Sequence, residues 1–183
     1  MAPVTLRPLD VQGADRADFV RFLTQNTFPF HSSSRPTKED VLRSIGAGRY
    51  DGDDHATFWI EERDIGRIGV AILEDLTDNA PLFDLRLGMA HRATGFGVLA
   101  LRALTAQVFT SYPAVTRLEG NTRDDNIAMR KTFLRCGFLK EAHYRKAWPM
   151  VGGTSRDTVA YGILRKDWER GTVTMFTWGD DPE

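Results

Sequence analysis

Three consecutive strand-like segments followed by a glycine turn and an apolar helix restrict what this chain can fold into. Residues 55–62 and 66–76 are rich in apolar and β-branched side chains, and residues 82–87 alternate apolar and charged side chains. The spacing then changes, because Val98 to Phe109 places apolar residues on one face of a helix. Adjacent strands followed by helices favour an antiparallel meander within an α+β fold over repeated βαβ units.

The rest of the chain supplies the remaining elements of this fold. They are predicted as strand, helix, helix, strand, helix, strand and strand at residues 4–9, 15–24, 37–45, 117–121, 127–135, 138–148 and 154–164. The expected order is β, α, α, β, β, β, α, β, α, β, β. It predicts one mixed central sheet of about seven strands, flanked on both faces by about four helices.

Composition and charge exclude several function classes. The chain has 183 residues and a net charge of −1, which suits one domain and offers no basic surface for nucleic acid. The single cysteine, Cys136, cannot form an internal disulfide, and the four histidines show no metal-ligand spacing. No apolar run suits a signal peptide or a membrane span, so we expect a cytoplasmic protein without a metal or a membrane partner.

The C-terminal residues are expected to form a tail that follows the domain. Residues 1–170 carry the predicted elements, and residues 171–183 form a tail that includes Val173, Met175, Phe176 and Trp178. These apolar side chains could pack as an extra strand on their own domain or as a swapped arm on a neighbour. A homodimer is therefore one expectation for this chain.

The turn Arg92-Ala93-Thr94-Gly95-Phe96-Gly97 is the first candidate binding feature. It lies between a strand and a helix, where unpaired amide N–H groups carry partial positive charge. Glycines let a bulky anion approach the backbone, so the turn suits a pyrophosphate, with Arg92 adding a charge-assisted contact. The alternative is a tight turn without a ligand. Neither the dinucleotide fingerprint nor the P-loop pattern is complete here.

The same turn resembles the pyrophosphate loop of the GCN5-related N-acetyltransferase (GNAT) superfamily, Arg/Gln-x-x-Gly-x-Gly/Ala. Downstream, Asn126 opens a helix that ends in Cys136-Gly137-Phe138, which is similar to the Asn-helix-Gly-Phe block of that family. The opening Leu6-Arg7-Pro8-Leu9 resembles the branch that acetylates the N-termini of ribosomal proteins. The resemblance extends from about Val4 to about Trp168 and implies a sheet that is splayed in the middle.

The resemblance also implies where acetyl-CoA would bind as the co-substrate. It would lie between the strand that ends near Gly88 and the strand around Leu118, with its pantetheine amides on the strand backbone and its pyrophosphate on the glycine turn. The implied contacts are Leu87, Gly88, Met89, Arg92, Ala93, Thr94, Gly95, Phe96, Gly97, Val98, Asn126 and Arg130. A backbone N–H of Leu87, Gly88 or Met89 would face the thioester oxygen.

The implied reaction is direct attack of a primary amine on the thioester, which requires a base and favours an acid. Glu119 is the first candidate base, on the strand expected to line the cleft, and Asp84 is the second. Related enzymes place a tyrosine or a serine as the acid where this chain has Phe133 and Met129, which cannot donate a proton. Tyr144 on the next strand is a candidate substitute, and a water is the alternative.

The acceptor is expected to meet the segment 26–31 and the closing strands. The candidate contacts are Asn26, Phe28, Phe30, His31 and Trp148, and His31 could also relay a proton. Phe28 and Phe30 could equally pack the first two helices onto the sheet. The acceptor would be a small-molecule amine or a protein N-terminus.

Two alternative functions stay open. One is transfer of a larger acyl group such as succinyl, which would need a cation near the thioester, such as Arg86 or His31. The other is a non-catalytic domain that binds CoA or a metabolite, which the missing acid would favour.

Overall fold

The computed structural model describes residues 3–150, 152–177 and 179, and their elements follow the predicted order with one further helix at the end. In chain order the elements are β1 (Val4–Pro8), α1 (Arg16–Gln25), α2 (Lys38–Gly46), β2 (Ala56–Glu62), β3 (Gly66–Glu74), β4 (Leu82–Leu87), the short 3-10 helix η1 (Met89–His91), α3 (Phe96–Ser111), β5 (Arg117–Arg123), α4 (Ile127–Arg135), β6 (Leu139–Pro149), β7 (Ser155–Leu164) and α5 (Arg165–Arg170). The expected α+β class is confirmed.

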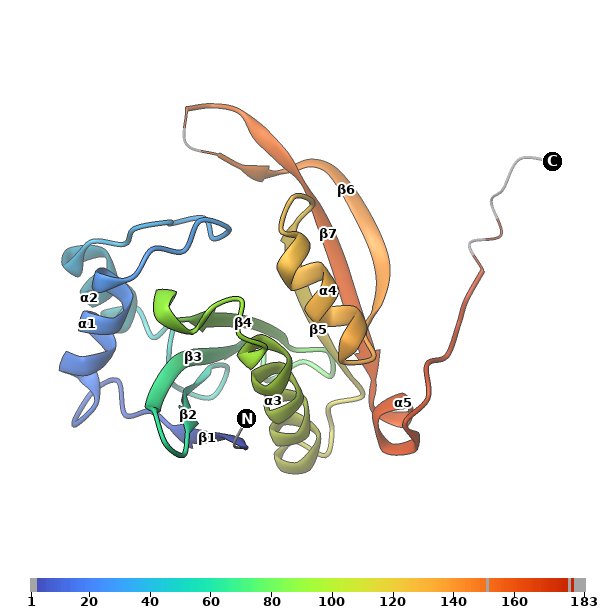
Figure 1. The fold of residues 1–183 in the computed structure, drawn as a ribbon, viewed down its shortest axis with the longest axis horizontal. Coiled ribbons are helices and arrows are strands. Elements are labelled where there is room, and N and C mark those ends of the chain that lie inside the picture. The colour runs from blue at the N-terminus through green and yellow to red at the C-terminus, as the bar shows by residue number, and fades with distance from the viewer. Residues whose placement is uncertain (1–2, 151, 178, 180–183) are drawn as a thin grey trace.

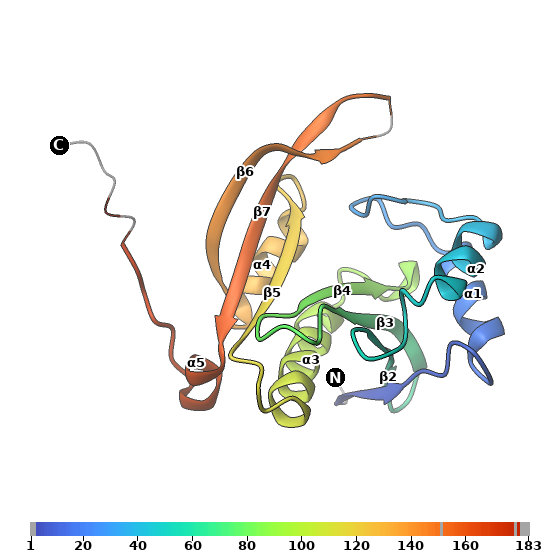
Figure 2. The same cartoon turned by 180° about the vertical axis from the view of Figure 1, so that it is seen from behind.

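The strands form one mixed seven-stranded sheet in the order β1-β2-β3-β4-β5-β7-β6. Neighbouring strands run antiparallel except β4 and β5, which run parallel at the middle of the sheet. Figures 1 and 2 show the result: β1 to β4 with α1 and α2 form one half, and β5 to β7 with α4 form the other. The predicted meander is therefore β2, β3 and β4.

Helices cover both faces of the sheet because its strands are buried on both sides. One core packs α3 and α4 against strand residues such as Phe58 and Ala71. The other packs α1 and α2 against Trp59 and Val70, which point to the opposite face from their chain neighbours. Phe28 belongs to this second core, so it does pack the first two helices onto the sheet.

Local sequence signals explain where two of the helices begin. Thr37 caps α2, because its Oγ1 accepts a hydrogen bond from the Asp40 N–H at 3.2 Å in a complete capping box. Asn126 caps α4 in the same way, with its Oδ1 accepting from the Met129 N–H at 3.2 Å. The sequence predicts both starts correctly, and the second one sets the position of a residue in the site below.

The described part of the tail, residues 171–177, contains no strand. Asp167 on α5 holds its beginning, accepting from the Thr174 N–H at 2.9 Å while its backbone oxygen accepts from the Thr172 N–H at 3.0 Å. Met175 is 75% exposed. Trp178 and residues 180–183 of the predicted tail lie outside the described residues, and the swapped arm stays a prediction.

Candidate functional site

The sheet opens between β4 and β5, and this opening creates the site. The two strands share one register pair, Leu82 with Glu119, and then separate. The Gly88 N–H bonds back to the Ile68 oxygen of β3 at 2.9 Å. Backbone groups along a strand alternate in direction, so those of Leu85 and Leu87 point toward the opening. An extended ligand can therefore bond to this edge, at which no strand pairs beyond Leu82 and the Leu87 oxygen accepts from Arg92 Nε.

The glycine turn at the end of β4 has the backbone of an anion seat. Ala93 and Gly95 have positive φ angles of 60° and 93°, and α3 begins directly afterwards at Phe96. Within the part of the chain that the structure describes, the amide N–H groups of residues 93–97 donate no hydrogen bond to another residue. Alternation of left-handed residues before a helix makes successive N–H groups converge on one point. The turn is therefore open to an anionic group.

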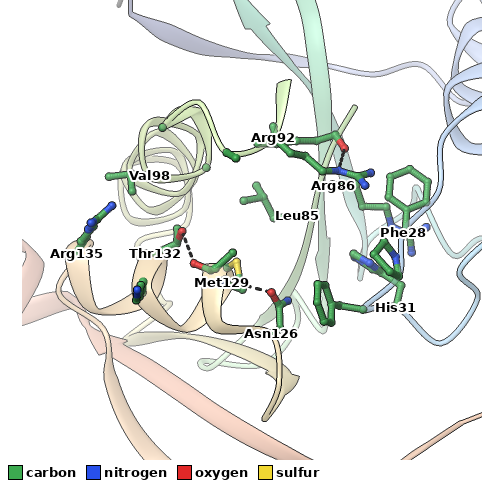
Figure 3. Close-up of a pocket in the computed structure, with 18 residues that line it drawn as sticks. Phe28, His31, Leu85, Arg86, Arg92, Val98, Asn126, Met129, Thr132 and Arg135 are labelled. Carbon is green, nitrogen blue, oxygen red and sulfur yellow. Dashed lines mark hydrogen bonds between the residues drawn. The ribbon is translucent and has the colours of Figure 1, made fainter. Parts of the chain in front are cut away.

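A first cavity of about 350 Å³ runs from this turn along α4 to the segment 28–31. Figure 3 shows it framed by β4, the glycine turn, α3 and α4, with Phe28 and His31 closing one end. Among the described residues, four cationic side chains and no acidic one line it: Arg86, Arg92, Lys131 and Arg135. Its charge and its open amides suit a polyphosphate ligand.

The implied CoA contacts fall into three groups. Leu87, Arg92, Ala93, Gly95, Gly97, Val98 and Asn126 line the first cavity. Thr94 bonds through its hydroxyl to the His91 oxygen at 2.7 Å, and Phe96 is buried in the core, so only their backbone can take part. Gly88, Met89 and Arg130 do not line it.

Three of the implied contacts need correction. Both N–H groups expected from Gly88 and Met89 are already used, the first by Ile68 and the second by Asn26 Oδ1 at 2.8 Å. Leu85, which the sequence analysis did not name, lines the first cavity beside Leu87. Arg130 bonds to the Asp124 oxygen at 2.8 Å and reaches toward Tyr161 instead of the cavity.

Arg92 lines the first cavity but has internal partners as well. Its Nε donates to the Leu87 oxygen at 2.9 Å, and its Nη2 donates to the Thr27 oxygen. Its guanidinium also lies over the Phe28 ring, 5.4 Å from the ring centre. Arg92 therefore joins the glycine turn to the segment after α1, and burial lowers its pKa.

A second cavity of about 230 Å³ adjoins the first on the other side of His31. The two cavities share six lining residues: Phe30, His31, Leu85, Arg86, Asn126 and Met129. The second one is completed by Glu74, Leu82, Asp84 and Trp148, together with residues at the end of β5. A molecule in each cavity would therefore meet its neighbour beside His31.

His31 and Asp84 form a hydrogen-bonded pair at this junction. His31 Nε2 lies 2.9 Å from Asp84 Oδ1, and Arg86 donates to Asp84 Oδ2 at 2.6 and 3.0 Å. Burial alone raises the pKa of Asp84, but the charge of Arg86 and the contacts with His31 outweigh it and hold that pKa well below its usual range. Asp84 is therefore ionised at neutral pH and can only accept hydrogen bonds.

The ionised carboxylate fixes the state of the neutral imidazole. Because Asp84 only accepts, the proton of neutral His31 lies on Nε2 and leaves a lone pair on Nδ1. Nδ1 is buried and has no hydrogen-bond partner within the described chain. A buried nitrogen without a partner costs free energy, so it marks a position where a ligand can supply the missing bond.

The segment that carries His31 is held from both halves of the sheet. Asn26 bonds to Met89, the Thr27 oxygen accepts from Arg92, and the Pro29 oxygen accepts from Arg123 Nη1 at 2.9 Å. Asn26 therefore positions this segment and does not line either cavity, unlike the acceptor role expected for it. Phe28, Phe30, His31 and Trp148 do line a cavity, as expected.

The structure places two predicted catalytic residues elsewhere. Glu119 lies where β4 and β5 still pair, and its Oε1 accepts from Arg117 Nε at 2.7 Å in a network with Glu141. Tyr144 is 53% exposed on β6 and lines neither cavity. Phe133 stacks on Tyr161 in the core, with 4.5 Å between ring centres. Among the named catalytic candidates, Asp84 alone lies at the site.

The sequence analysis did not identify the face of α4 that lines the first cavity and carries two of its cationic residues. Ala128, Lys131, Thr132 and Arg135 line the first cavity at spacings of three, one and three residues. Such spacings place side chains on one helix face, so the helix period after Asn126 was the signal that could have found them. The resemblance had directed attention to Arg130 instead, which lies on the adjacent face.

In the described residues, no group of three or more His, Cys, Asp and Glu side chains could hold a metal ion. None of the described helices is long and apolar enough to cross a membrane.

Comparisons with known proteins agree with this fold. The solved structures similar to this chain include a spermidine N-acetyltransferase from Vibrio cholerae in complex with CoA and spermine, with a TM-score of 0.76 and 17% identity over 91% of this chain and 98% of that one. A GNAT-family acetyltransferase from Bacillus anthracis has a TM-score of 0.72 and 14% identity over 90% and 96% of the two chains. Among curated proteins, no sequence matches significantly.

The sequence itself carries the family assignment. Residues 4–139 match the family described as the acetyltransferase (GNAT) domain, which covers most of the chain and both motifs named above. The chain therefore belongs to the GNAT family of N-acetyltransferases, which use acetyl-CoA as the acetyl donor.

Proposed function

We propose that this enzyme transfers the acetyl group at the junction of the two cavities, from acetyl-CoA in the first to a small-molecule primary amine in the second, with His31 as the general base. The observation that carries the proposal is the buried, unpartnered Nδ1 of His31 beside an ionised Asp84. A base needs a free lone pair near the reacting nitrogen, and this one lies on a residue that both cavities share.

The donor is supported by the charge and backbone of the first cavity. Its glycine turn offers amides to a pyrophosphate, and Lys131 and Arg135 offer positive charge along α4. The backbone groups of Leu85 and Leu87 at the opening suit the amides of the pantetheine arm. Acetyl-CoA bound in this way would direct its thioester toward His31 and Met129, which lie at the junction of the two cavities.

In the proposed transfer, His31 takes a proton from the attacking nitrogen. The acceptor ammonium first releases one proton to solvent, and the neutral amine nitrogen attacks the thioester carbonyl carbon, which forms the new C–N bond. The nitrogen then loses a second proton to His31 Nδ1. The C–S bond then breaks, and the CoA thiolate takes a proton from solvent or from the imidazolium. No acid at Phe133 is required, because a thiolate is a good leaving group and the base carries the proton that the amine lost.

An acetyl donor is favoured over succinyl. A succinyl carboxylate would need a free cation near the thioester, and Arg86 is the one permanently charged side chain shared by both cavities. Arg86 already makes two hydrogen bonds to Asp84 and lies over the Phe28 ring. Its charge is therefore compensated before any substrate binds.

A turnover assay tests the proposal directly. Wild-type protein is mixed with acetyl-CoA and a panel of primary amines that includes spermidine, spermine and an alanine-led peptide, and free thiol release is followed with mass analysis of the product. We expect acetylation of at least one small-molecule amine. CoA binding by calorimetry without turnover of any acceptor would instead support a non-catalytic binding domain.

A further inference from the structure

Glu74, the last residue of β3, has no role in the proposed transfer. It lines the second cavity together with Leu82 and Asp84. Register pairs Glu74 with Leu82 and Ile72 with Asp84, and directly paired residues project from the same face of a sheet. Glu74 and Asp84 are therefore diagonal neighbours on the wall of one cavity, with β-carbons roughly 7–8 Å apart.

The charges of these two carboxylates are compensated differently. Asp84 is bonded to both Arg86 and His31. Glu74 makes no hydrogen bond, and no ion pair within 4 Å, to any described residue. Burial raises the pKa of Glu74, the charges of Asp84 and Asp75 act in the same direction, and His55 and Arg86 act against them. Glu74 is thus a carboxyl group of the second cavity that no described cation contacts directly.

The two cavities consequently differ in sign. The first has four cationic side chains and no acidic one, whereas the second has Glu74, Asp84 and Arg86 as its charged lining. Because Arg86 compensates Asp84, ionisation of Glu74 gives the second cavity a net negative charge when His31 is neutral. A carboxylate without a partner in a confined cavity is stabilised most by a cationic ligand group.

We propose that Glu74 binds a second cationic group of the acceptor, so that the enzyme prefers amines that carry another ammonium group several atoms from the reacting nitrogen. This inference rests on the proposed function, because it places the reacting amine at His31 and the second ammonium at Glu74. Trp148 and Leu82 supply the apolar surface for the carbon chain between the two groups. The geometry assigns Glu74 to acceptor selection and leaves the chemical step to His31.

Matched acceptors of equal chain length test the preference in the wild-type enzyme. Putrescine and butylamine share four carbons and differ in the second ammonium, and cadaverine and pentylamine form a second pair. We expect kcat/KM to be about tenfold or more higher for each diamine, which is the effect of one charge-assisted hydrogen bond. Equal values within both pairs would overturn the inference.

Two isosteric variants locate the effect. Glu74→Gln removes the charge in the cavity, and Asp75→Asn removes the charge of its exposed neighbour, at a φ of 59° that asparagine tolerates. We expect Glu74→Gln to abolish most of the diamine preference, through a higher KM for the diamine. Asp75→Asn should keep the preference. Equal losses for putrescine and butylamine in Glu74→Gln would contradict the assignment.

A binding measurement separates this inference from the proposed function. Calorimetry of putrescine and butylamine against the CoA complex requires no turnover. Tighter putrescine binding that Glu74→Gln weakens supports the Glu74 site even if acetyl transfer fails. Transfer to butylamine without any putrescine preference in binding or turnover keeps the proposed function and overturns the Glu74 site.

Discussion

His31 is bonded through one ring nitrogen and buried without a partner at the other. Asp84 orients Nε2 at 2.9 Å, and the ring packs edge-on against Phe28 with 5.6 Å between ring centres. An orphaned polar atom costs free energy that a purely structural histidine would avoid by turning toward a partner. The orientation is the one that the proposed role of Nδ1 as a base requires, and two substitutions test that role.

Replacement of His31 by glutamine should slow the chemical step. Glutamine keeps the size and can bond to Asp84, but it cannot accept a proton at neutral pH. We expect kcat to fall by roughly 10²–10⁴ while CoA affinity stays within about twofold. Acetylation kinetics and calorimetry measure the two quantities, and His143→Gln, on an exposed part of β6, is the matched control. An unchanged kcat would exclude His31 as the base.

Replacement of Asp84 by asparagine should affect both stability and activity. The change leaves Arg86 without its anionic partner, so we expect a loss of roughly 2–4 kcal/mol in the free energy of unfolding. It also removes the carboxylate that holds the proton of His31 on Nε2, which lowers kcat. The double variant Asp84→Asn with Arg86→Met removes the unpaired charge and should recover much of the stability without the activity. Recovery of both together would show that Asp84 has only a structural role.

At the scale of elements, the β4–turn–α3 unit combines an open strand edge with an open helix N-terminus. The two glycines of the turn differ in whether the backbone conformation requires glycine. Gly95 has a φ of 93°, which the backbone requires, whereas a side-chain atom at Gly97 would meet Thr132 at an ordinary 3.6 Å. Gly97 can therefore be changed without backbone strain, which makes it the better probe of the anion seat.

Substitution of Gly97 by glutamate should weaken CoA binding without unfolding the protein. The carboxylate places bulk and negative charge beside the amides of the turn, where the pyrophosphate is expected. We expect the Kd for CoA to rise about tenfold or more, measured by calorimetry. Gly97→Ala is the control and should bind within about threefold of wild type. Native affinity in Gly97→Glu would refute the assignment of the turn.

At the scale of the molecule, Asp15 joins β1, β2, β3 and α1 around the second core. Its Oδ1 accepts from Arg7 Nη2 at 2.9 Å, from Trp59 Nε1 at 3.0 Å and from Arg67 Nη2 at 3.3 Å. The hydrogen bond from Arg7 is the largest cause that holds the pKa of Asp15 far below its usual range, although burial acts against it. This cluster supports the half of the sheet that presents Asp84.

The Asp15 cluster predicts how stability depends on pH. Because the folded pKa is lowered, its contribution is complete above the unfolded pKa of about 3.9 and declines as pH falls below that value. Urea unfolding should show that Asp15→Asn is less stable than wild type at pH 6, and that this difference shrinks by about 1 kcal/mol at pH 3. Asp53→Asn, in an exposed loop, is the control. A difference that does not change with pH would contradict the prediction.

The sequence by itself determined the features that depend on neighbouring residues. The order of strands and helices, the caps at Thr37 and Asn126 and the glycine turn all follow from local spacing and turn chemistry. The sequence also identified candidates for acceptor binding and proton transfer from their residue types and from the segments that carry them. These candidates are Phe28, Phe30, His31, Asp84 and Trp148.

Only the tertiary structure decided which candidates meet. His31 and Asp84 are 53 residues apart, and no local pattern records that a loop held by Arg92 and Arg123 brings them within 2.9 Å. Glu119 lies outside both cavities because the point at which β4 and β5 separate is set by strand register, and that register places it on the paired side. Helix and strand patterns repeat over a few residues, whereas the site depends on packing between distant segments, which is why the structure was needed to define it.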